Sequence, residues 1–337
     1  MMPLIEIPGV PYDYANERPA RTLEEHVSAV IERIRKCWTD RSLYVDLSWL
    51  DETESLSDGQ VAFGIVLDEC RRLGIRAIPV LPRTPSQETL DAVVGYSATS
   101  RLGACVRLVV DDFEEEVDIE ADVSRLVTAF GTRTADSLDL LIDLEDLSYE
   151  TSRALLIVRS IFSMIPRRDE WRRMIAASAS FPEDLSDVNA GSISTLPRRE
   201  WQLWRTLQRR PTALPRRDLI YGDYAIAHPI PKELDPRTMR MSANIRYTSV
   251  DDWLIIKGRN VRQYGFEQYF ELCRVLVGRP EYSGRGFSWG DNFIEQCAQG
   301  MQGPGNATTW RKVGTNHHLT LVVRALANAL NAASGGS

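Results

Sequence analysis

Short apolar runs recur along the chain, and longer segments with helical periodicity separate them. Consecutive or alternating hydrophobic residues in each run are typical of β-strands, whereas the segments between them repeat apolar positions every three to four residues, as amphipathic helices do. The predicted strands are residues 3–7, 43–47, 76–81, 104–110, 138–144, 173–179, 219–225 and either 243–248 or 253–257.

The segments between these runs carry their own helix start and stop signals. Thr22 and Glu25 have the spacing of a capping box, and Pro85 follows Thr84 in the order typical of a helix start. Gly74 and Gly131 stand where a left-handed residue ends a helix. The caps therefore agree with the strand spacing.

Eight strand–helix units predict an α/β fold of the (β/α)8 type, a TIM-like barrel. The alternative is an open, doubly wound α/β sheet, because both folds alternate the same elements. We expect residues 1–333 to form one α/β barrel domain, since barrels of this length commonly fold as a single unit.

Three further helices are predicted after the last strand, at residues 266–277, 292–300 and 317–330. A barrel needs only one of them, so we expect residues 259–333 to form a C-terminal helical extension that packs on the barrel. Residues 334–337, Ser-Gly-Gly-Ser, have the composition of a disordered tail.

Composition narrows the class of protein. The net charge of −7 excludes a global basic field that would gather nucleic acid non-specifically. No apolar stretch is long enough to span a bilayer, and no signal peptide is present, so we expect a cytoplasmic protein without a membrane partner. Five scattered cysteines without a CxxC pair favour buried free thiols over a zinc site or disulfides.

Most of the predicted strands carry charged residues near their carboxyl end, where barrel enzymes place their chemistry. A charge buried under the covering helices would cost several kcal/mol, so we expect these side chains to point inward at the mouth of the barrel. These residues are Glu6, Asp46, Arg107, Asp143, Glu145, Asp223, Arg246 and Lys257.

The types of these residues suggest a catalytic or substrate-binding site. The carboxylates of Glu6, Asp46, Asp143 and Asp223 can serve as general acids or bases, and the three aspartates also offer the oxygen ligands that Mg²⁺ prefers. Arg107, Arg246 and Lys257 suit an anionic phosphate or carboxylate group. The structural alternative is a plug of mutually neutralising charges, because no P-loop, HxxxH or GxSxG motif is present.

Residues 286–318 are dense in Gly, Trp, Asn, His and basic side chains. We expect Thr315 or Asn316 to cap the last helix, which would place His317 in its first turn. The helix dipole would keep this histidine neutral, so it could act as a base, although capping and packing are the structural alternative. The candidate anion ligands beside this helix start are Trp310, Arg311 and Asn316.

Several segments resemble one known family. They are Pro-Leu-Ile-Glu-Ile-Pro at 3–8, Gly258-Arg259, Gln263-Tyr264, Phe-Ser-Trp-Gly-Asp at 287–291, and Gly-Asn-Ala-Thr-Thr-Trp-Arg-Lys-Val-Gly-Thr-Asn-His-His-Leu at 305–319. The chain resembles the beta-protein family named after a protein of a T4-type bacteriophage. This resemblance implies a phage or bacterial protein from phage–host conflict loci and brings no catalytic mechanism. Family members usually have a further segment before the first motif, so the resemblance suggests a truncated or different start here.

Two functional hypotheses follow. The first is a barrel enzyme, of hydrolase or phosphodiesterase type, that acts on a phosphorylated small molecule or nucleic acid, with Mg²⁺ as a candidate cofactor. It requires the charged side chains to converge at the strand ends. The second is a non-catalytic protein that recognises a phage component or a protein partner in a defence module through an exposed aromatic surface. The tryptophans that would form this surface are Trp201, Trp204, Trp289 and Trp310.

Overall fold

The structure is a computed structural model that describes residues 1–38, 40–50, 61–114, 116–131, 137–147, 151–208, 219–230 and 241–334. Of the predicted tail, residues 335–337 lie outside the described part of the chain, and Ser334 ends the last helix.

The described residues divide into two compact units. Unit 1 comprises Met1–Glu145, Leu155–Ala177 and Arg210–Gly222, and unit 2 comprises Asp146–Ala154, Ser178–Arg209 and Asp223–Ser337. The prediction of one domain over residues 1–333 stays a prediction.

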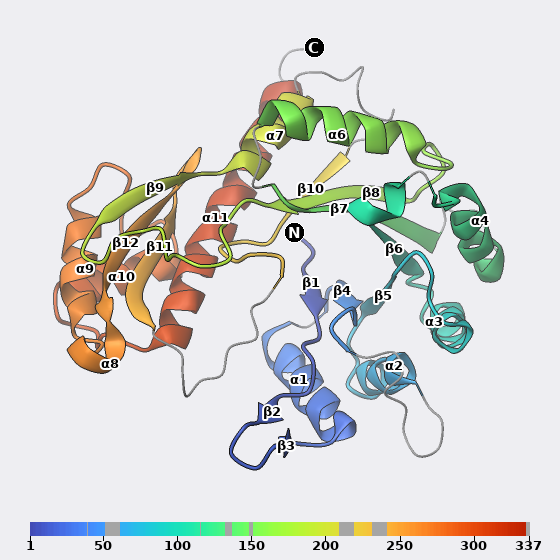
Figure 1. Cartoon of the computed structure of the whole chain (residues 1–337), viewed down its shortest axis with the longest axis horizontal. Coiled ribbons are helices and arrows are strands. Elements are labelled where there is room, and N and C mark those ends of the chain that lie inside the picture. The colour runs from blue at the N-terminus through green and yellow to red at the C-terminus, as the bar shows by residue number, and fades with distance from the viewer. Residues whose placement is uncertain are drawn as a thin grey trace. The chain divides into compact units, whose positions relative to one another are not determined.

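Parallel strands and their covering helices make up unit 1 (Figure 1). Its elements, some of which end just inside unit 2, are β1 (Leu4–Glu6), β2 (Tyr12–Asp13), β3 (Arg18–Pro19), α1 (Leu23–Cys37), β4 (Leu43–Asp46), α2 (Ala62–Arg72), β5 (Ala77–Leu81), α3 (Gln87–Ser100), β6 (Ala104–Val109), η1 (Val110–Phe113), α4 (Ile119–Phe130), β7 (Leu138–Asp146), α6 (Thr151–Met164), β8 (Arg173–Ala179) and β10 (Leu219–Asp223).

Seven of these strands form one curled parallel sheet in the order β1-β4-β5-β6-β7-β8-β10. The register aligns strand ends across the sheet: Glu6 lies opposite Asp46 on the β1–β4 pair, and Val109 lies opposite Asp143 on the β6–β7 pair. Helices α1, α2, α3 and α4 follow one another along the outer side of the sheet (Figure 1). The carboxyl ends of the strands therefore meet at one edge.

The mixed α/β class is confirmed, and the first seven predicted strands are all present. A closed TIM-like barrel is not shown, because no pairing among the described residues joins β10 to β1; the open doubly wound alternative fits. The prediction of an eighth parallel strand is wrong. Its two candidate segments are β11 (Ser242–Thr248) and β12 (Asp252–Asn260), which pair antiparallel in another sheet. The linker between them is too short for a parallel crossover, which needs a dozen or more residues.

Unit 2 is built on the three-stranded sheet β11-β12-β9. Its further elements are β9 (Ile193–Pro197), α7 (Arg199–Gln208), α8 (Val261–Tyr264), α9 (Gln268–Val277), α10 (Trp289–Ala298) and α11 (Ala307–Ser334). One face of the sheet packs on α9, α10 and α11 around Tyr247, Tyr269 and Trp310. The other face packs around Phe181 and Trp253.

Helix α11 begins ten residues earlier than predicted. Asn306 accepts a hydrogen bond from the backbone N–H of Thr309 at 3.0 Å and caps the helix, so neither Thr315 nor Asn316 is the cap. Gly314 lies within the helix. A Cβ atom at this position would lie 2.9 Å from the carbonyl oxygen of Arg246, so this glycine allows α11 to approach β11 closely.

We expect Gly314→Ala to destabilise the protein, although alanine is the better helix former. The added methyl group would meet backbone of β11, and overpacking of this kind costs about 1–3 kcal/mol. The matched control is Gly95→Ala in α3, where a Cβ atom meets nothing within 4 Å. That change should stabilise by up to about 1 kcal/mol. Urea denaturation of both variants measures the difference, and equal effects would contradict the packing role.

Candidate functional site

Three strands of the parallel sheet carry, near their carboxyl end, an aspartate with the same local geometry. Asp46 and Asp223 are the last residues of β4 and β10, and Asp143 stands three residues before the end of β7. In each, one carboxylate oxygen accepts a hydrogen bond from the backbone N–H two residues later, which closes a turn of the Asx type. The other carboxylate oxygen interacts with a side-chain cation or a histidine. The pairs are Asp46 with Ser48 at 2.9 Å, Asp143 with Glu145 at 2.9 Å, and Asp223 with Ala225 at 3.0 Å.

Arg107 on β6 gathers three carboxylates at the carboxyl edge of unit 1. Its Nη1 atom donates to Glu6 at 2.9 Å and to Asp46 at 2.6 Å. Its Nε and Nη2 atoms donate to Asp143 at 3.0 and 2.6 Å. The structure therefore brings together four of the residues predicted to form a site, from four different strands.

The parity of the strands explains why these side chains share one face. Tyr44, Cys105 and Leu141, each two residues before one of the charged positions, pack together in a hydrophobic cluster of unit 1. Successive side chains alternate between faces, so positions two residues apart lie on the same side of a strand. Asp46, Arg107 and Asp143 thus stand directly beyond this cluster. We call Glu6, Asp46, Arg107 and Asp143 the Arg107 site.

The Arg107 site has more negative than positive charge. Three carboxylates face one guanidinium, and the side chains of Asp46 and Asp143 are almost fully buried. Glu6 is more accessible, with 22% of its side chain exposed. Among the described residues of this site, one arginine faces three carboxylates and does not compensate their full negative charge.

Two glutamates at this edge hold their protons more tightly than free glutamate does. Burial raises the pKa of Glu6, and the charge of Asp46 adds to this, while Arg107 opposes it. Burial also raises the pKa of Glu145, with further contributions from Asp143 and Asp111. Glu145 has a left-handed backbone, with φ at 50°. Raised carboxyl pKa values are typical of general acids.

The opposite end of the same sheet carries a different cluster. Asp139, at the amino end of β7, is fully buried and accepts hydrogen bonds from Tyr44 at 2.7 Å and from Arg172 at 2.7 and 2.8 Å. Arg173 lies 3.5 Å away. Here two cations face one carboxylate at the amino end of the strands, where barrel-like folds place stabilising contacts.

The Arg107 site does not fit Mg²⁺ as it is arranged. Among the described residues, no group of three or more His, Cys, Asp or Glu side chains is placed to hold a metal ion. Asp46 and Asp143 each use one oxygen in a turn and the other on Arg107, which leaves no open pair of ligands. We therefore derive no step through a metal.

Asp223, the fourth predicted carboxylate, belongs to unit 2. Its Oδ2 atom lies 2.9 Å from Nε2 of His318, whose other ring nitrogen lies 3.0 Å from the hydroxyl of Thr248. Both ring nitrogens of this buried histidine therefore have protein partners, which indicates a structural role. The sequence offered no signal for this pair.

His317 lies in the middle of α11, not in its first turn, and is fully buried. Its Nδ1 faces Asp291 at 2.9 Å and its Nε2 faces the carbonyl oxygen of Thr248 at 2.8 Å. Tyr247 stacks on the ring with centroids 3.8 Å apart and donates a hydrogen bond to Asp291. With no free ring nitrogen, His317 ties α11 to α10 and β11 and is not placed to act as a base.

Two more residues of the C-terminal constellation have packing roles. The indole of Trp310 stacks on Tyr269 with centroids 4.2 Å apart and donates to the carbonyl oxygen of Pro304. Asn316 accepts a hydrogen bond from the backbone N–H of Gly290 at 2.9 Å. A Cβ atom on Gly290 would lie 2.4 Å from a carbonyl oxygen of α11. The density of Gly, Trp, Asn and His in this segment therefore reflects closely packed helices.

The remaining candidate anion ligands lie in unit 2. Lys257 donates to the carbonyl oxygens of Leu185 and Val188, both at 2.7 Å. Arg246 is half-buried, whereas Arg311 is exposed.

The predicted surface of four tryptophans is not formed as a whole. Trp201, Trp204 and Trp310 are buried, and Trp289 is 52% exposed. Four of the five cysteines are buried, as predicted, and Cys37 is exposed.

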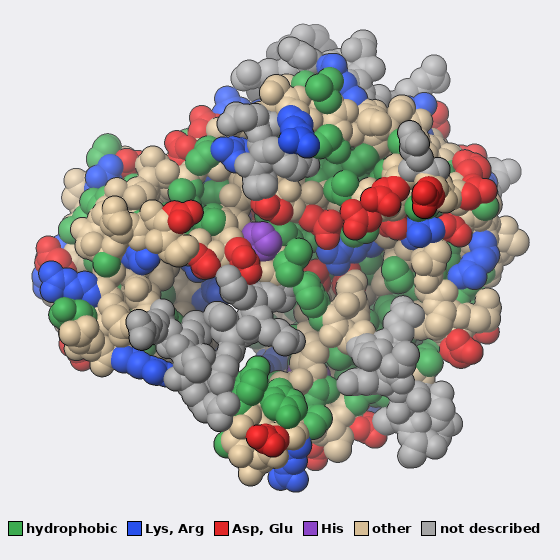
Figure 2. Space-filling model, viewed as in Figure 1, with side chains coloured by type: hydrophobic (Ala, Val, Ile, Leu, Met, Phe, Trp, Pro, Cys, Tyr) green, Lys and Arg blue, Asp and Glu red, His purple; other side chains and the backbone are tan. Residues whose placement is uncertain are grey.

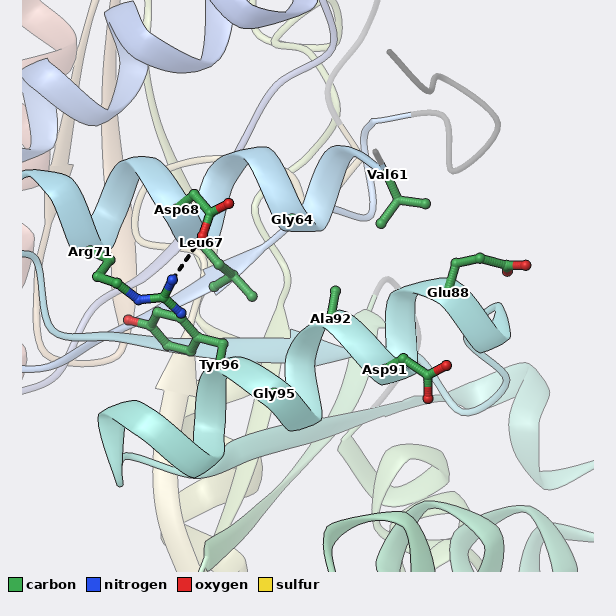
Figure 3. A pocket seen from close by; sticks show the side chains of 10 residues that line it. All are labelled: Val61, Gly64, Leu67, Asp68, Arg71, Glu88, Asp91, Ala92, Gly95 and Tyr96. Atoms are coloured by element: carbon green, nitrogen blue, oxygen red, sulfur yellow. Dashed lines mark hydrogen bonds and ion pairs between the residues drawn. The ribbon is translucent and has the colours of Figure 1, made fainter. Parts of the chain in front are cut away.

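A groove of about 410 Å³ lies between α2 and α3 on the outer side of unit 1 (Figure 3). Gly64, Ala92 and Gly95 leave the space, because they have little or no side chain. Arg71 pairs with Asp68 at one end of it. None of the candidate residues lines this groove, so it adds nothing to the Arg107 site.

Comparison with known proteins identifies the family. The chain matches the family model described as Beta protein over residues 1–324, and it therefore belongs to the Beta protein family. No curated protein matches it. The solved structure described as "Crystal Structure of SacUVDE" is similar with a TM-score of 0.23 and 11% identity, over 60% of this chain and 66% of that chain, just under two thirds of its length. A similarity this low says nothing about the fold or function of this chain.

Within the described residues, none of the helices combines the length and the apolar character needed to cross a membrane.

Proposed function

We propose that the Arg107 site is the acid–base centre of a hydrolytic enzyme, with Glu6 as the group that transfers the proton. The observation that carries this proposal is the excess of carboxylates at the carboxyl edge of a curled parallel sheet, with a raised pKa at the most accessible of them. Ligands of open α/β sheets bind at this edge. In this reading, Asp46 and Asp143 fix the guanidinium, and the guanidinium positions Glu6.

The charge of the site favours one class of substrate. A bare phosphate would meet an arginine already shared by three carboxylates, so binding there would add a further anion to an acidic site. An uncharged polar substrate avoids this repulsion. Protonated Glu6 would give its proton to the leaving group, and Glu145, also with a raised pKa, is the candidate to accept a proton from water.

The predicted phosphorylated substrate is disfavoured by the acidic charge of this site. A role in phage–host conflict and a place in the cytoplasm remain proposals that rest on the sequence alone. Recognition of a phage component or a defence partner rests on Trp289, since the other three tryptophans of the predicted surface are buried.

The test compares uncharged and phosphorylated substrates on the full chain. Chromogenic glycosides, esters and amides are assayed beside aryl phosphates, each with and without Mg²⁺. We expect turnover of an uncharged substrate, and Glu6→Gln should lower it about 100-fold or more. The matched control is Glu24→Gln on α1, an exposed glutamate of the same unit. Turnover of aryl phosphates only, or equal activity of the two variants, would contradict the proposal.

Stability gives a second readout for Glu6. Because its pKa is raised in the folded protein, ionised Glu6 disfavours folding at neutral pH, and this cost fades as the pH falls toward its ordinary pKa of 4.5. Glu6→Gln should therefore raise the thermal midpoint at pH 7.5, and the gain should shrink by pH 4.5. A gain that does not depend on pH would show that Glu6 is not the titrating group.

A further inference from the structure

Arg246 on β11 is a half-buried arginine whose hydrogen-bond partners are all uncharged. Its Nη1 atom donates to the carbonyl oxygen of Ile226 at 2.8 Å, and its Nε atom donates to the amide oxygen of Asn244 at 3.3 Å. The guanidinium lies over the ring of Phe181, 4.6 Å from the centroid. These contacts hold the group in place without neutralising it.

Among the charged groups around Arg246, Arg311 has the largest electrostatic effect on its pKa. Burial lowers the pKa of Arg246 to about 10, and the positive charge of Arg311 contributes in the same direction. The geometry is consistent with this: Gly314 of α11 approaches the backbone carbonyl of Arg246, and Arg311 lies one helical turn before that glycine. Arg311 is exposed, and no hydrogen bond or ion pair involves its side chain in the described part of the chain.

Four other arginines that are wholly or partly buried have a carboxylate partner. Arg83 pairs with Asp112, Arg107 with three carboxylates, and Arg172 with Asp139. The fully buried Arg198 has Glu200 within 3.2 Å. Arg246 and Arg311 have no such partner in the described residues, and an anion would relieve their mutual repulsion.

We propose that Arg246 and Arg311 together bind a phosphate group. Of the five N–H protons of the Arg246 guanidinium, the two hydrogen bonds use two, which leaves both protons on Nη2 and one on Nη1. A phosphate suits this pair better than a carboxylate, because its charge of nearly −2 compensates two guanidinium groups. Its oxygens can also accept hydrogen bonds from both guanidinium groups at once. Arg246 supplies the fixed donor, and exposed Arg311 closes on the ligand.

Two kinds of ligand could supply the phosphate group. A small molecule with a terminal phosphate and the backbone of a single-stranded nucleic acid both present this group. The inference does not depend on the Arg107 site, since it concerns residues of unit 2 only. Loss of hydrolytic activity and loss of phosphate binding can therefore be separated.

The experiment titrates the full chain with inorganic pyrophosphate, adenosine monophosphate and a ten-nucleotide single-stranded DNA, each followed by calorimetry. We expect saturable binding of pyrophosphate that weakens about 10- to 100-fold in Arg311→Gln. Arg311→Lys should have an intermediate affinity, because lysine keeps the positive charge but cannot form the paired hydrogen bonds of a guanidinium group. The matched control is Lys312→Gln, an exposed cation at the next position of the same helix that faces another direction.

The outcomes separate the alternatives. Tighter binding of the DNA than of pyrophosphate, with the same loss in Arg311→Gln, would assign the site to a nucleic-acid backbone; the reverse order would assign it to a small phosphorylated molecule. No saturable binding by any of the three probes would overturn the proposal. An equal loss in Arg311→Gln and Lys312→Gln would overturn it as well, since it would show general attraction to positive charge. Circular dichroism on each variant confirms that the fold is retained.

Discussion

Arg107→Met should lower the free energy of unfolding by about 3–5 kcal/mol, because it leaves buried carboxylates without their cation. Methionine fills similar volume, so packing changes little, while Asp46 and Asp143 keep side chains that are at most 2% exposed. Urea denaturation at pH 7 measures the loss. The triple variant with Asp46→Asn and Asp143→Asn should recover part of it, since neutral amides do not need the guanidinium.

The control for this prediction is Arg72→Met on α2. Arg72 also pairs with a glutamate, Glu69, but its side chain is 61% exposed, and surface pairs contribute about 0–1 kcal/mol. A loss in Arg107→Met no greater than in Arg72→Met would mean that the Arg107 site does not stabilise unit 1. The same result would weaken the proposal that Arg107 is a fixed positioning group.

Asp291→Asn should have the second large effect, on unit 2. Nδ1 of the buried His317 lies 2.9 Å from Asp291, and Nε2 donates to the carbonyl oxygen of Thr248, which can only accept. Burial by itself would raise the pKa of Asp291, but the hydrogen bond and charge of His317, with hydrogen bonds from Ser288 and Tyr247, hold it below its usual value. Breaking one member of a buried ion pair costs about 3–5 kcal/mol.

The pH dependence of this effect follows from the direction of the shift. A carboxylate with a lowered pKa in the folded protein contributes stability above its ordinary pKa of 3.8, and this contribution is lost as the pH falls through the lower folded value. The difference between the wild type and Asp291→Asn should therefore be full at pH 7 and shrink below about pH 4. Hydrogen exchange of amides in α10 and α11 reports this unit separately from the other.

The matched control for Asp291→Asn is Glu271→Gln on α9. Glu271 pairs with Arg274 at 2.7 Å, but both side chains are more than half exposed. Its removal should change amide protection in unit 2 by no more than about 1 kcal/mol. Equal protection in the two variants would mean that the His317–Asp291 pair is not ionised in the folded protein.

The sequence predicted the parallel sheet well because its signals are local. Each of the first seven strands is a short run of apolar residues between turn or helix-cap signals, and its identity does not depend on distant contacts. The turn aspartates at positions 46, 143 and 223 also follow from local chemistry. The eighth strand could not be assigned in this way, since β11 and β12 have the same apolar pattern as the others and differ only in their partner.

The candidate site was predicted in part. Strand parity and a charge near the carboxyl end were enough to bring Glu6, Asp46, Arg107 and Asp143 together, because parallel strands align their ends. The sequence groups Arg246 and Lys257 with these residues only because it assigns their segments to the same sheet. Asp291 and its partner His317 lie 26 residues apart, beyond the reach of any local pattern.

What the sequence by itself determined is the alternation of strands and helices, the family, and the residue types available at the strand ends. Only the tertiary structure decided which charges meet, since pairing depends on register and on approach distances that no local signal encodes. Gly314 shows the physical reason, because only in the fold is it the contact that lets α11 pack on β11. His317, three residues further along α11, is fully buried.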